Sequence, residues 1–192
     1  MVILAAFSLA GCVGDDDTSL PPYTPLLLSQ DFETGADNDL LEIPGWINYA
    51  EEGTAKWRIQ RYSNNGYAEF NPYGSGNVSN VGWLISPEFT LNEAGKTLVF
   101  EVSQSYVTST ANSFGVFIST DFSETNPSAA TWAPLTASVP GPDAEFFLFQ
   151  DSGEIDLSAY SGNVRIGFKV VGSGTNATLD GAYQIDNVKI LK

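Results

Sequence analysis

Hydrophobic and polar residues alternate with a period of two over much of the chain. Within residues 98–103, the side chains of Leu98, Phe100 and Val102 fall on one face of an extended chain, and the residues between them fall on the other. Residues 163–170 alternate in the same way, with apolar residues at positions 164, 166, 168 and 170. Both patterns are typical of β-strands that bury one face.

Further strands are expected where short apolar runs are bounded by clusters of Gly, Asn, Ser and Pro, which favour turns. Such runs occupy residues 26–32, 56–61, 82–86, 114–119, 146–149 and 183–191. No segment sustains a helical period, and turn signals recur too often for a bundle of helices. The pattern therefore predicts an all-β fold, a two-sheet antiparallel β-sandwich of the jelly-roll type.

The N-terminal segment is apolar and carries no charge. Residues 1–11 are too short to cross a bilayer, which takes about 20 apolar residues, and they have the character of a signal-peptide core. Residues 9–12, Leu-Ala-Gly-Cys, resemble the lipobox of bacterial lipoproteins. This resemblance implies that the Cys12 thiol is acylated and that the segment before it is removed. A buried N-terminal strand is the alternative interpretation.

The chain divides into three expected parts. Residues 1–11 form the signal peptide, residues 12–24 the lipidated cysteine and a flexible tether rich in Asp and Pro, and residues 25–192 one jelly-roll domain. The acidic triplet at 15–17 resembles the surface-export signal of some Gram-negative lipoproteins, and a solvated linker is the alternative. These features predict an outer-membrane lipoprotein, exposed at the cell surface, that contacts the membrane through its lipid alone.

Composition argues against several classes of function. Lys and Arg number 8 against 23 Asp and Glu, and the net charge of -15 repels the phosphates of nucleic acids. Cys12 is the one cysteine, so neither an intramolecular disulfide nor a thiolate metal cluster can form. The absence of histidine removes the commonest general base and the Ser-His-Asp triad.

A series of short motifs in fixed order resembles a known group of surface domains. The motifs are DFE at 31–33, PGW at 44–46, Trp57, WLISP at 83–87, LVFEVS at 98–103, FISTD at 117–121, Trp132, IDLSAYSG at 155–162, VRIGF at 164–168 and IDNVKI at 185–190. Together they resemble the choice-of-anchor J and cleaved-adhesin group, which is related in pattern to eukaryotic MAM domains. The resemblance implies a jelly roll used for adhesion or carbohydrate binding, often with a structural calcium ion, and no known catalytic activity.

Carboxylates near both ends of the domain are candidate calcium ligands. The alternation of Val188 and Ile190 predicts that Asp186 also points inward, where a bare carboxylate is costly. Asp31 and Glu33 share one face of the first strand. Calcium takes about six to eight oxygen ligands, and the resemblance places such an ion at Glu33 and Asp186. Weaker candidates are Asp31, Asn187, Asp37 and Asp39. Alternatively, Asp186 only caps a turn by accepting hydrogen bonds from backbone N–H groups.

The aromatic residues fall into two sets. The tryptophans lie in or beside strand patterns and are expected mainly in the core: Trp46, Trp57, Trp83 and Trp132. Residues 62–80 interleave rings with Asn and Gly, so we expect an exposed loop whose rings and amides suit the faces and hydroxyls of sugars. Its candidate ligand-binding residues are Tyr62, Tyr67, Phe70 and Tyr73. A purely structural loop is the alternative.

The sequence thus favours a binding module over an enzyme. We expect a calcium-stabilised adhesion or carbohydrate-binding domain whose partner is a glycan or an extracellular protein. One alternative is a structural surface component without a glycan ligand. The other is a glycoside hydrolase, which needs two placed carboxylates, but 23 acidic residues always offer such a pair, so this signal carries no weight.

Replacement of Cys12 tests the anchor. Cys12→Ser should abolish acylation, because a serine hydroxyl does not replace the cysteine thiol as the acylated group. Metabolic labelling with a fatty acid measures the modification, and Ser19→Ala in the tether is a control that should keep the label. Label that persists in Cys12→Ser would contradict the lipoprotein assignment.

Overall fold

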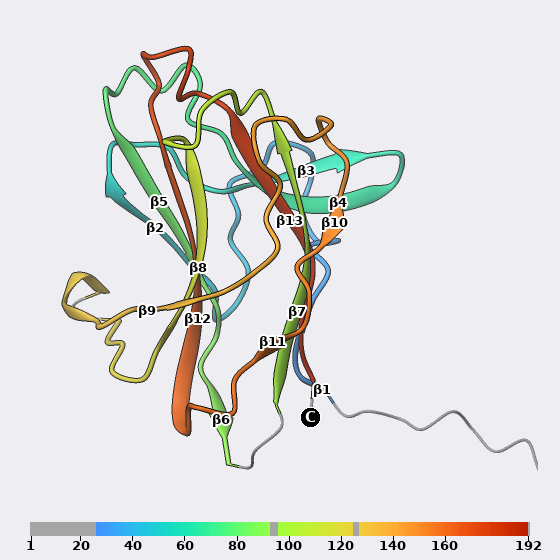
Figure 1. The fold of residues 1–192 in the computed structure, drawn as a ribbon, viewed down its shortest axis with the longest axis vertical. Coiled ribbons are helices and arrows are strands. Elements are labelled where there is room, and N and C mark those ends of the chain that lie inside the picture. The colour runs from blue at the N-terminus through green and yellow to red at the C-terminus, as the bar shows by residue number, and fades with distance from the viewer. Residues whose placement is uncertain (1–25, 93–95, 125–126, 192) are drawn as a thin grey trace, which may run out of the picture.

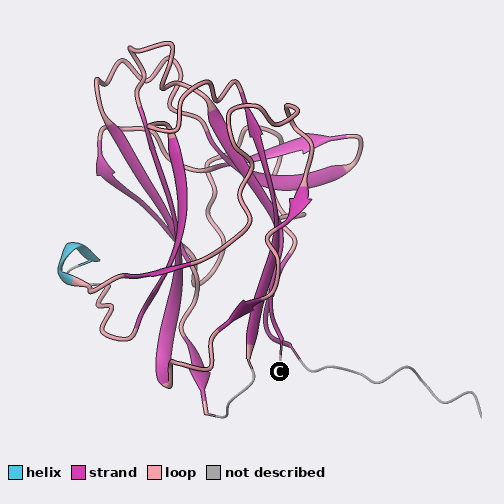
Figure 2. Ribbon diagram, in the orientation of Figure 1, coloured by secondary structure: helices cyan, strands magenta, loops and turns pink. Residues whose placement is uncertain are grey.

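The computed structural model describes residues 26–92, 96–124 and 127–191. Over these residues the chain forms strands β1 to β13 and one short 3-10 helix, η1 (Pro127–Ala129). The strands lie in two layers that face each other, and the connecting loops gather at the ends of the layers (Figures 1 and 2). The predicted two-sheet antiparallel sandwich is confirmed. In the ranges described, no helix is long and apolar enough to cross a membrane.

The first sheet contains the first and last strands of the domain. Its order is β10-β7-β13-β4-β3, with β1 also pairing with β13 and β11 with β7. Its strands are β1 (Leu26–Gln30), β3 (Arg58–Tyr62), β4 (Asn65–Phe70), β7 (Thr97–Ser105), β10 (Gln150–Asp151), β11 (Ile155–Asp156) and β13 (Ala182–Leu191). The antiparallel pairing of Leu28 with Ile190 places the two ends of the domain side by side.

The second sheet has the order β2-β5-β12-β8-β9, and β6 also pairs with β12. Its strands are β2 (Ile47–Glu52), β5 (Asn80–Ile85), β6 (Phe89–Leu91), β8 (Ser113–Ser119), β9 (Ala133–Leu135) and β12 (Gly162–Gly172). The long strand β12 lies at its centre, between β5 and β8 (Figure 1). The helix η1 projects from the side of this sheet that faces away from the first sheet (Figure 2).

The core fills the space between the sheets. Leu98, Phe100 and Val102 of β7 enter it from the first sheet, as their alternation predicts, and the apolar positions of β12 enter it from the second. Phe100 and Phe168 meet edge to face across the core, with ring centroids 5.2 Å apart. Complete burial of each such side chain stabilises the fold by about 1.5 to 3 kcal/mol. These contacts therefore hold the two sheets together.

Strand β4 runs through the segment that was expected to be an exposed loop. Ser63 and Asn64, with φ of 50° and 69°, turn the chain from β3 into β4 with the left-handed geometry of tight hairpins. Ala68 and Phe70 then enter the core, where the Phe70 ring lies 5.8 Å from Trp57. The prediction of Phe70 as a ligand-binding residue is wrong, because its side chain is fully buried.

A bulge in β13 reverses the predicted direction of Asp186. Ile185 and Val188 both belong to the core although they are not an even number of residues apart, and the pairing of β13 with β7 shifts register between Asp186 and Lys189. Asn187 has a φ of 50° at this point. A bulge adds one residue to the alternation, so Asp186 lies on the outer face of the first sheet. The prediction that it shares the inward face of Val188 is therefore wrong.

Residues 146–149 do not form the predicted strand. They lie in the loop between β9 and β10, where Phe147 has a φ of 59°. Pairing with β7 begins at Gln150, opposite Val102. The large apolar side chains of this loop remain exposed: Phe146, Phe147 and Leu148. Apolar character here marks a surface rather than a buried strand face.

Replacement of Gly82 tests the packing of the core against the second sheet. A Cβ atom at this position would lie 1.9 Å from a ring carbon of Phe70, so in Gly82→Ala either the ring or the β5 backbone must move. Overpacking of this kind costs about 1 to 3 kcal/mol or more. Gly141 has open space around it, and Gly141→Ala should change the free energy of unfolding by less than about 0.5 kcal/mol. Urea denaturation compares the variants, and equal stabilities would refute this packing.

Candidate ligand-binding sites

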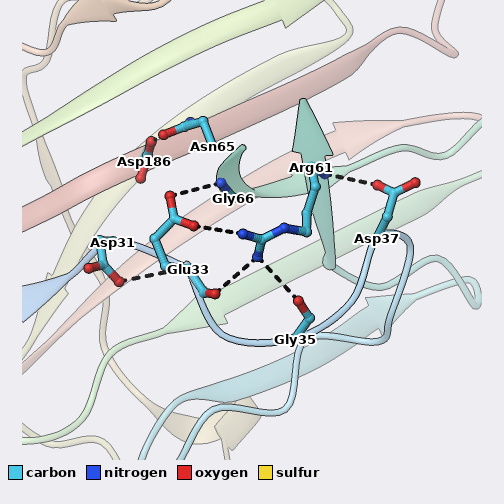
Figure 3. Close-up of polar contacts among 8 residues, drawn as sticks. All are labelled: Asp31, Glu33, Gly35, Asp37, Arg61, Asn65, Gly66 and Asp186. Carbon is cyan, nitrogen blue, oxygen red and sulfur yellow. Dashed lines mark hydrogen bonds and ion pairs between the residues drawn. The ribbon is translucent and has the colours of Figure 1, made fainter. Parts of the chain in front are cut away.

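Three of the predicted metal ligands, Asp31, Glu33 and Asp186, form what we call the acidic cluster (Figure 3). The Asp31 carboxylate accepts a hydrogen bond from the Glu33 N–H at 3.2 Å. One oxygen of Glu33 accepts from the Gly66 N–H at 2.9 Å, and the other forms an ion pair with Arg61 at 2.9 Å. Arg61 therefore supplies the positive charge that Glu33 contacts directly.

Asp186 is the buried member of the acidic cluster. Asp186 is 3% exposed. Its carboxylate accepts hydrogen bonds from Asn65 Nδ2 at 3.0 Å and from the Asn187 N–H at 2.6 Å. Burial raises the pKa of Asp186 above its ordinary value, and the nearby charges of Glu101 and Glu33 raise it further. The two hydrogen bonds favour the charged form but do not outweigh burial.

The other predicted metal ligands point elsewhere. Asn187 donates its side-chain N–H to Glu101 at 2.6 Å. Asp37 accepts from the Arg61 backbone N–H and so ties its loop to β3, whereas Asp39 accepts from the Ala36 N–H and stabilises a local turn. Across the described ranges, no three His, Cys, Asp or Glu side chains are placed so that they could hold a metal ion. Calcium binding stays a prediction.

The predicted ligand-binding aromatics do not share one site. Tyr62 is 75% exposed at the β3–β4 hairpin, whereas Tyr67 is half-buried and packs edge to face on Phe149 at 5.5 Å. Tyr73 is 74% exposed and lines a cavity of about 430 Å³, which we call the loop cavity. The residues lining the loop cavity are Asn71, Tyr73, Tyr106, Thr108, Phe146, Ala177, Asp180 and Ala182. The sequence identified Tyr73 but none of the others.

A second cavity, the sheet-face cleft, lies on the outer face of the second sheet and has a volume of about 350 Å³. Its lining residues are Tyr49, Glu51, Trp83, Ile85, Phe117, Pro127, Ala130, Trp132 and Lys169. The rings of Trp83 and Trp132 stack with centroids 4.9 Å apart and planes at 29°. Both belong to an apolar cluster separate from the inter-sheet core. The expectation of buried tryptophans holds for Trp46 and Trp57 in the inter-sheet core and for Trp83, which is 5% exposed beneath Trp132. It is wrong for Trp132, which is only partly buried.

Gly167 allows the two tryptophan rings to lie directly on the sheet. A Cβ atom at this position would lie 2.9 Å from ring carbons of both Trp83 and Trp132. Real Cβ contacts this short essentially never occur, so any other residue would displace at least one ring. The glycine in the middle of β12 therefore has a packing reason, which is common for glycine within a strand.

A charged pair lies beside these rings. The Glu51 carboxylate accepts a hydrogen bond from Trp83 Nε1 at 2.6 Å and pairs with Lys169 Nζ at 3.1 Å. Lys169 also lies over the Trp83 ring, 4.8 Å from its centroid. Burial alone would raise the pKa of Glu51, but the hydrogen bonds from Trp83 and Lys169 outweigh it and lower that pKa. The sheet-face cleft thus combines fixed aromatic rings with an ionised acid and a cation.

Comparison with known proteins gives the fold. No family model and no curated protein matches the chain. The K1 cleaved adhesin domain of Lys-gingipain from Porphyromonas gingivalis W83 superposes with a TM-score of 0.53 at 22% identity, covering 85% of this chain and 96% of that one. The K2 cleaved adhesin domain of Lys-gingipain gives a TM-score of 0.54 at 10% identity, with coverages of 85% and 96%.

A carbohydrate-binding module described for specific mannan recognition is also similar. It superposes with a TM-score of 0.51 at 14% identity, covering 89% of this chain and 99% of that one. Identities this low indicate a shared fold and no more. The chain therefore has the jelly-roll fold of the cleaved adhesin domains, as the order of its sequence motifs predicts.

Proposed function

We propose that this domain is a carbohydrate-binding adhesion module that holds a glycan in the sheet-face cleft. The observation that carries the proposal is the stacked pair of Trp83 and Trp132 beside the ion pair of Glu51 and Lys169. Aromatic rings pack against the apolar faces of sugars, and charged groups exchange hydrogen bonds with hydroxyls. The volume of about 350 Å³ lies within the range of small-ligand sites, about 300 to 1,000 Å³.

Two further observations support binding over catalysis. The similar solved structures are described as cleaved adhesin domains and as a module for mannan recognition. In the described part of the chain, Glu51 is the one acidic residue that lines the sheet-face cleft. A glycoside hydrolase needs two carboxyl groups, one of them a general acid of raised pKa, whereas the pKa of Glu51 is lowered. The cleft therefore lacks the chemistry of the hydrolase alternative.

Trp132→Ala tests the sheet-face cleft. The Trp132 side chain is partly buried and lies outside the inter-sheet core, so its truncation should remove half of the stacked pair and lower stability without unfolding the domain. A glycan array that includes mannans identifies the ligand, and calorimetric titration then measures affinity. We expect Trp132→Ala to weaken binding at least tenfold, which corresponds to about 1.4 kcal/mol. Its melting temperature should fall because Trp83 and Phe122 lose packing, so affinity is measured well below that temperature.

Tyr62→Ala is the matched control for this experiment, because Tyr62 is an exposed ring far from the cleft, on a hairpin of the other sheet. It should bind like the wild type. If no glycan on the array binds, a structural surface component is favoured. Release of shorter oligosaccharides, followed by mass spectrometry and lost in Glu51→Gln, would favour the hydrolase.

We propose that a lipidated Cys12 anchors this domain to the outer membrane and displays it at the cell surface. Cys12 and the tether at 13–24 lie outside the described residues. The lipobox-like sequence and the acidic triplet at 15–17 support this location. The tether joins the domain at β1 of the first sheet, whereas the sheet-face cleft lies on the outer face of the second sheet. The attachment point therefore leaves the cleft accessible.

We also propose that a calcium ion stabilises the acidic cluster. The carboxylates have the right chemistry, since calcium takes carboxylate, amide and backbone oxygens. Asn65 donates its side-chain N–H to Asp186 and would have to turn its amide to offer the oxygen to an ion. The raised pKa of buried Asp186 supports the proposal, because a cation would offset the charges that Glu33 and Glu101 add beside it. To bind the ion, Glu33 would have to give up its ion pair with Arg61.

Melting curves at several pH values test the calcium proposal. The folded-state pKa of Asp186 is raised, so without calcium its contribution to stability is greatest at low pH and falls as pH rises through that pKa. Calcium at 100 times its Kd should add about 2.7 kcal/mol, and the gain should shrink as the pH is lowered, because the raised pKa of Asp186 favours its protonated form, which binds a cation poorly.

Asp186→Asn should abolish the calcium response and part of the pH dependence. Glu69, whose pKa is also raised by burial, supplies a remaining part. Asp143→Asn, at an exposed loop position, makes the same charge change and should leave the response intact. Melting curves that are identical in calcium and in chelator would refute the proposal.

A further inference from the structure

The loop cavity is a second candidate site that the proposed glycan cleft does not use. Three of its lining rings are exposed to solvent, Tyr73 by 74%, Tyr106 by 61% and Phe146 by 43%. Phe147 and Leu148 extend the exposed apolar surface beside it. Clustered apolar side chains at a protein surface mark interaction sites. This cavity lies at the end of the first sheet, because Tyr106 follows β7 and Ala182 begins β13.

A single buried side chain fixes two of these rings. Gln104 accepts a hydrogen bond from the Val107 N–H at 3.0 Å and donates one to the Ala144 carbonyl at 2.7 Å. Its own backbone carbonyl accepts from the Phe147 N–H at 2.8 Å. The segments that carry Tyr106 and Phe146 are therefore held to the same residue. Their rings lie 4.9 Å apart at 52° to each other.

The backbone at this site is strained. Tyr106 has a φ of 58° and Phe147 a φ of 59°, a region that bulky residues rarely occupy. Gly181 makes room for the turn, since a Cβ there would lie 2.6 Å from the Val107 backbone nitrogen. Such strain costs about 1 to 3 kcal/mol per residue and concentrates at binding sites. The strained backbone at Tyr106 and Phe147 thus holds aromatic rings toward solvent at a cost in folding free energy.

The polar groups of the loop cavity select the ligand chemistry. Asn71 already accepts a hydrogen bond from the Tyr73 N–H at 3.0 Å, and the Thr108 hydroxyl donates to the Thr178 carbonyl at 3.4 Å. Among the described residues, the Asp180 carboxylate has neither an ion pair nor a hydrogen bond, and no Lys or Arg lines the cavity. The cavity therefore offers three rings and one available negative charge.

We infer that the loop cavity binds an organic cation, an ammonium or guanidinium group. Aromatic ring faces attract a cation, and here they line the same cavity as a carboxylate. A sugar is recognised by polar side chains beside a ring face, and two of those in this cavity, Asn71 and Thr108, already hold hydrogen bonds within the protein. The net charge of -15 also draws cations toward the surface. Lysine or arginine side chains of a partner protein and small quaternary amines carry this chemistry.

Titration with three probes tests the inference. The protein used has a tag in place of residues 1–12. The probes are choline, the peptide acetyl-Gly-Lys-Gly-amide, and the same peptide with its lysine acetylated, and backbone amide NMR shifts measure binding. We expect the backbone amide signals of Tyr106 and Asp180 to shift saturably with choline, with the lysine peptide or with both. The acetylated peptide should cause no shift. Binding of the peptide alone would assign the cation to a protein partner, and binding of choline alone to a small amine.

Variants separate this site from the rest of the surface. Asp180→Asn and Tyr73→Ala should each lower the affinity for the cation at least fivefold. Asp143→Asn should leave that affinity unchanged. Trp132→Ala should also leave cation binding unchanged, so failure here and failure of the glycan proposal can be told apart. Absence of saturable shifts at millimolar probe, equal binding of the acetylated peptide, or full affinity in Asp180→Asn would overturn the inference.

Discussion

Aromatic packing against the backbone of the second sheet, on both of its faces, is the constraint on which the rest of the structure depends. From the core side, the Phe70 ring lies against Gly82, and from the outer side Trp83 and Trp132 lie against Gly167. Two glycines, one in β5 and one in β12, make these approaches possible. The inner contact closes the sandwich and the outer one forms the floor of the sheet-face cleft. Fold and site therefore rest on the same local requirement.

Strands with one apolar face can be predicted from the sequence together with the direction of their side chains. For strands with other patterns, either the strand or that direction is missed. β7 and β12 follow from alternation because Val99, for example, which lies between Leu98 and Phe100, faces away from the core. β4 is hidden because Gly and Ala mark most of its buried side, leaving Phe70 as the one large apolar signal. In β5 both faces are apolar, so alternation cannot tell that Leu84 enters the core while Trp83 faces outward.

The candidate sites depend on register and on distant segments, which a pattern along one segment does not contain. The bulge at Asn187 decides which way Asp186 faces, and it is set by the pairing of β13 with β7. Tyr106 and Phe146 meet because Gln104 binds both of their loops. Tyr73 could be chosen from composition, since Asn and Gly around a tyrosine favour an exposed turn, but its partners in the cavity could not.

The pairing of β1 with β13 has a mechanical consequence. A force transmitted along the chain from the residues before Leu26 enters the domain through β1, a strand of five residues whose ladder partner in the described structure is β13. The short ladder between Leu26 and Gln30 is therefore the first to bear the load. If it peels away, β13 keeps its pairing with β7 and β4. The strand can thus act as an extensible link that yields before the two sheets separate.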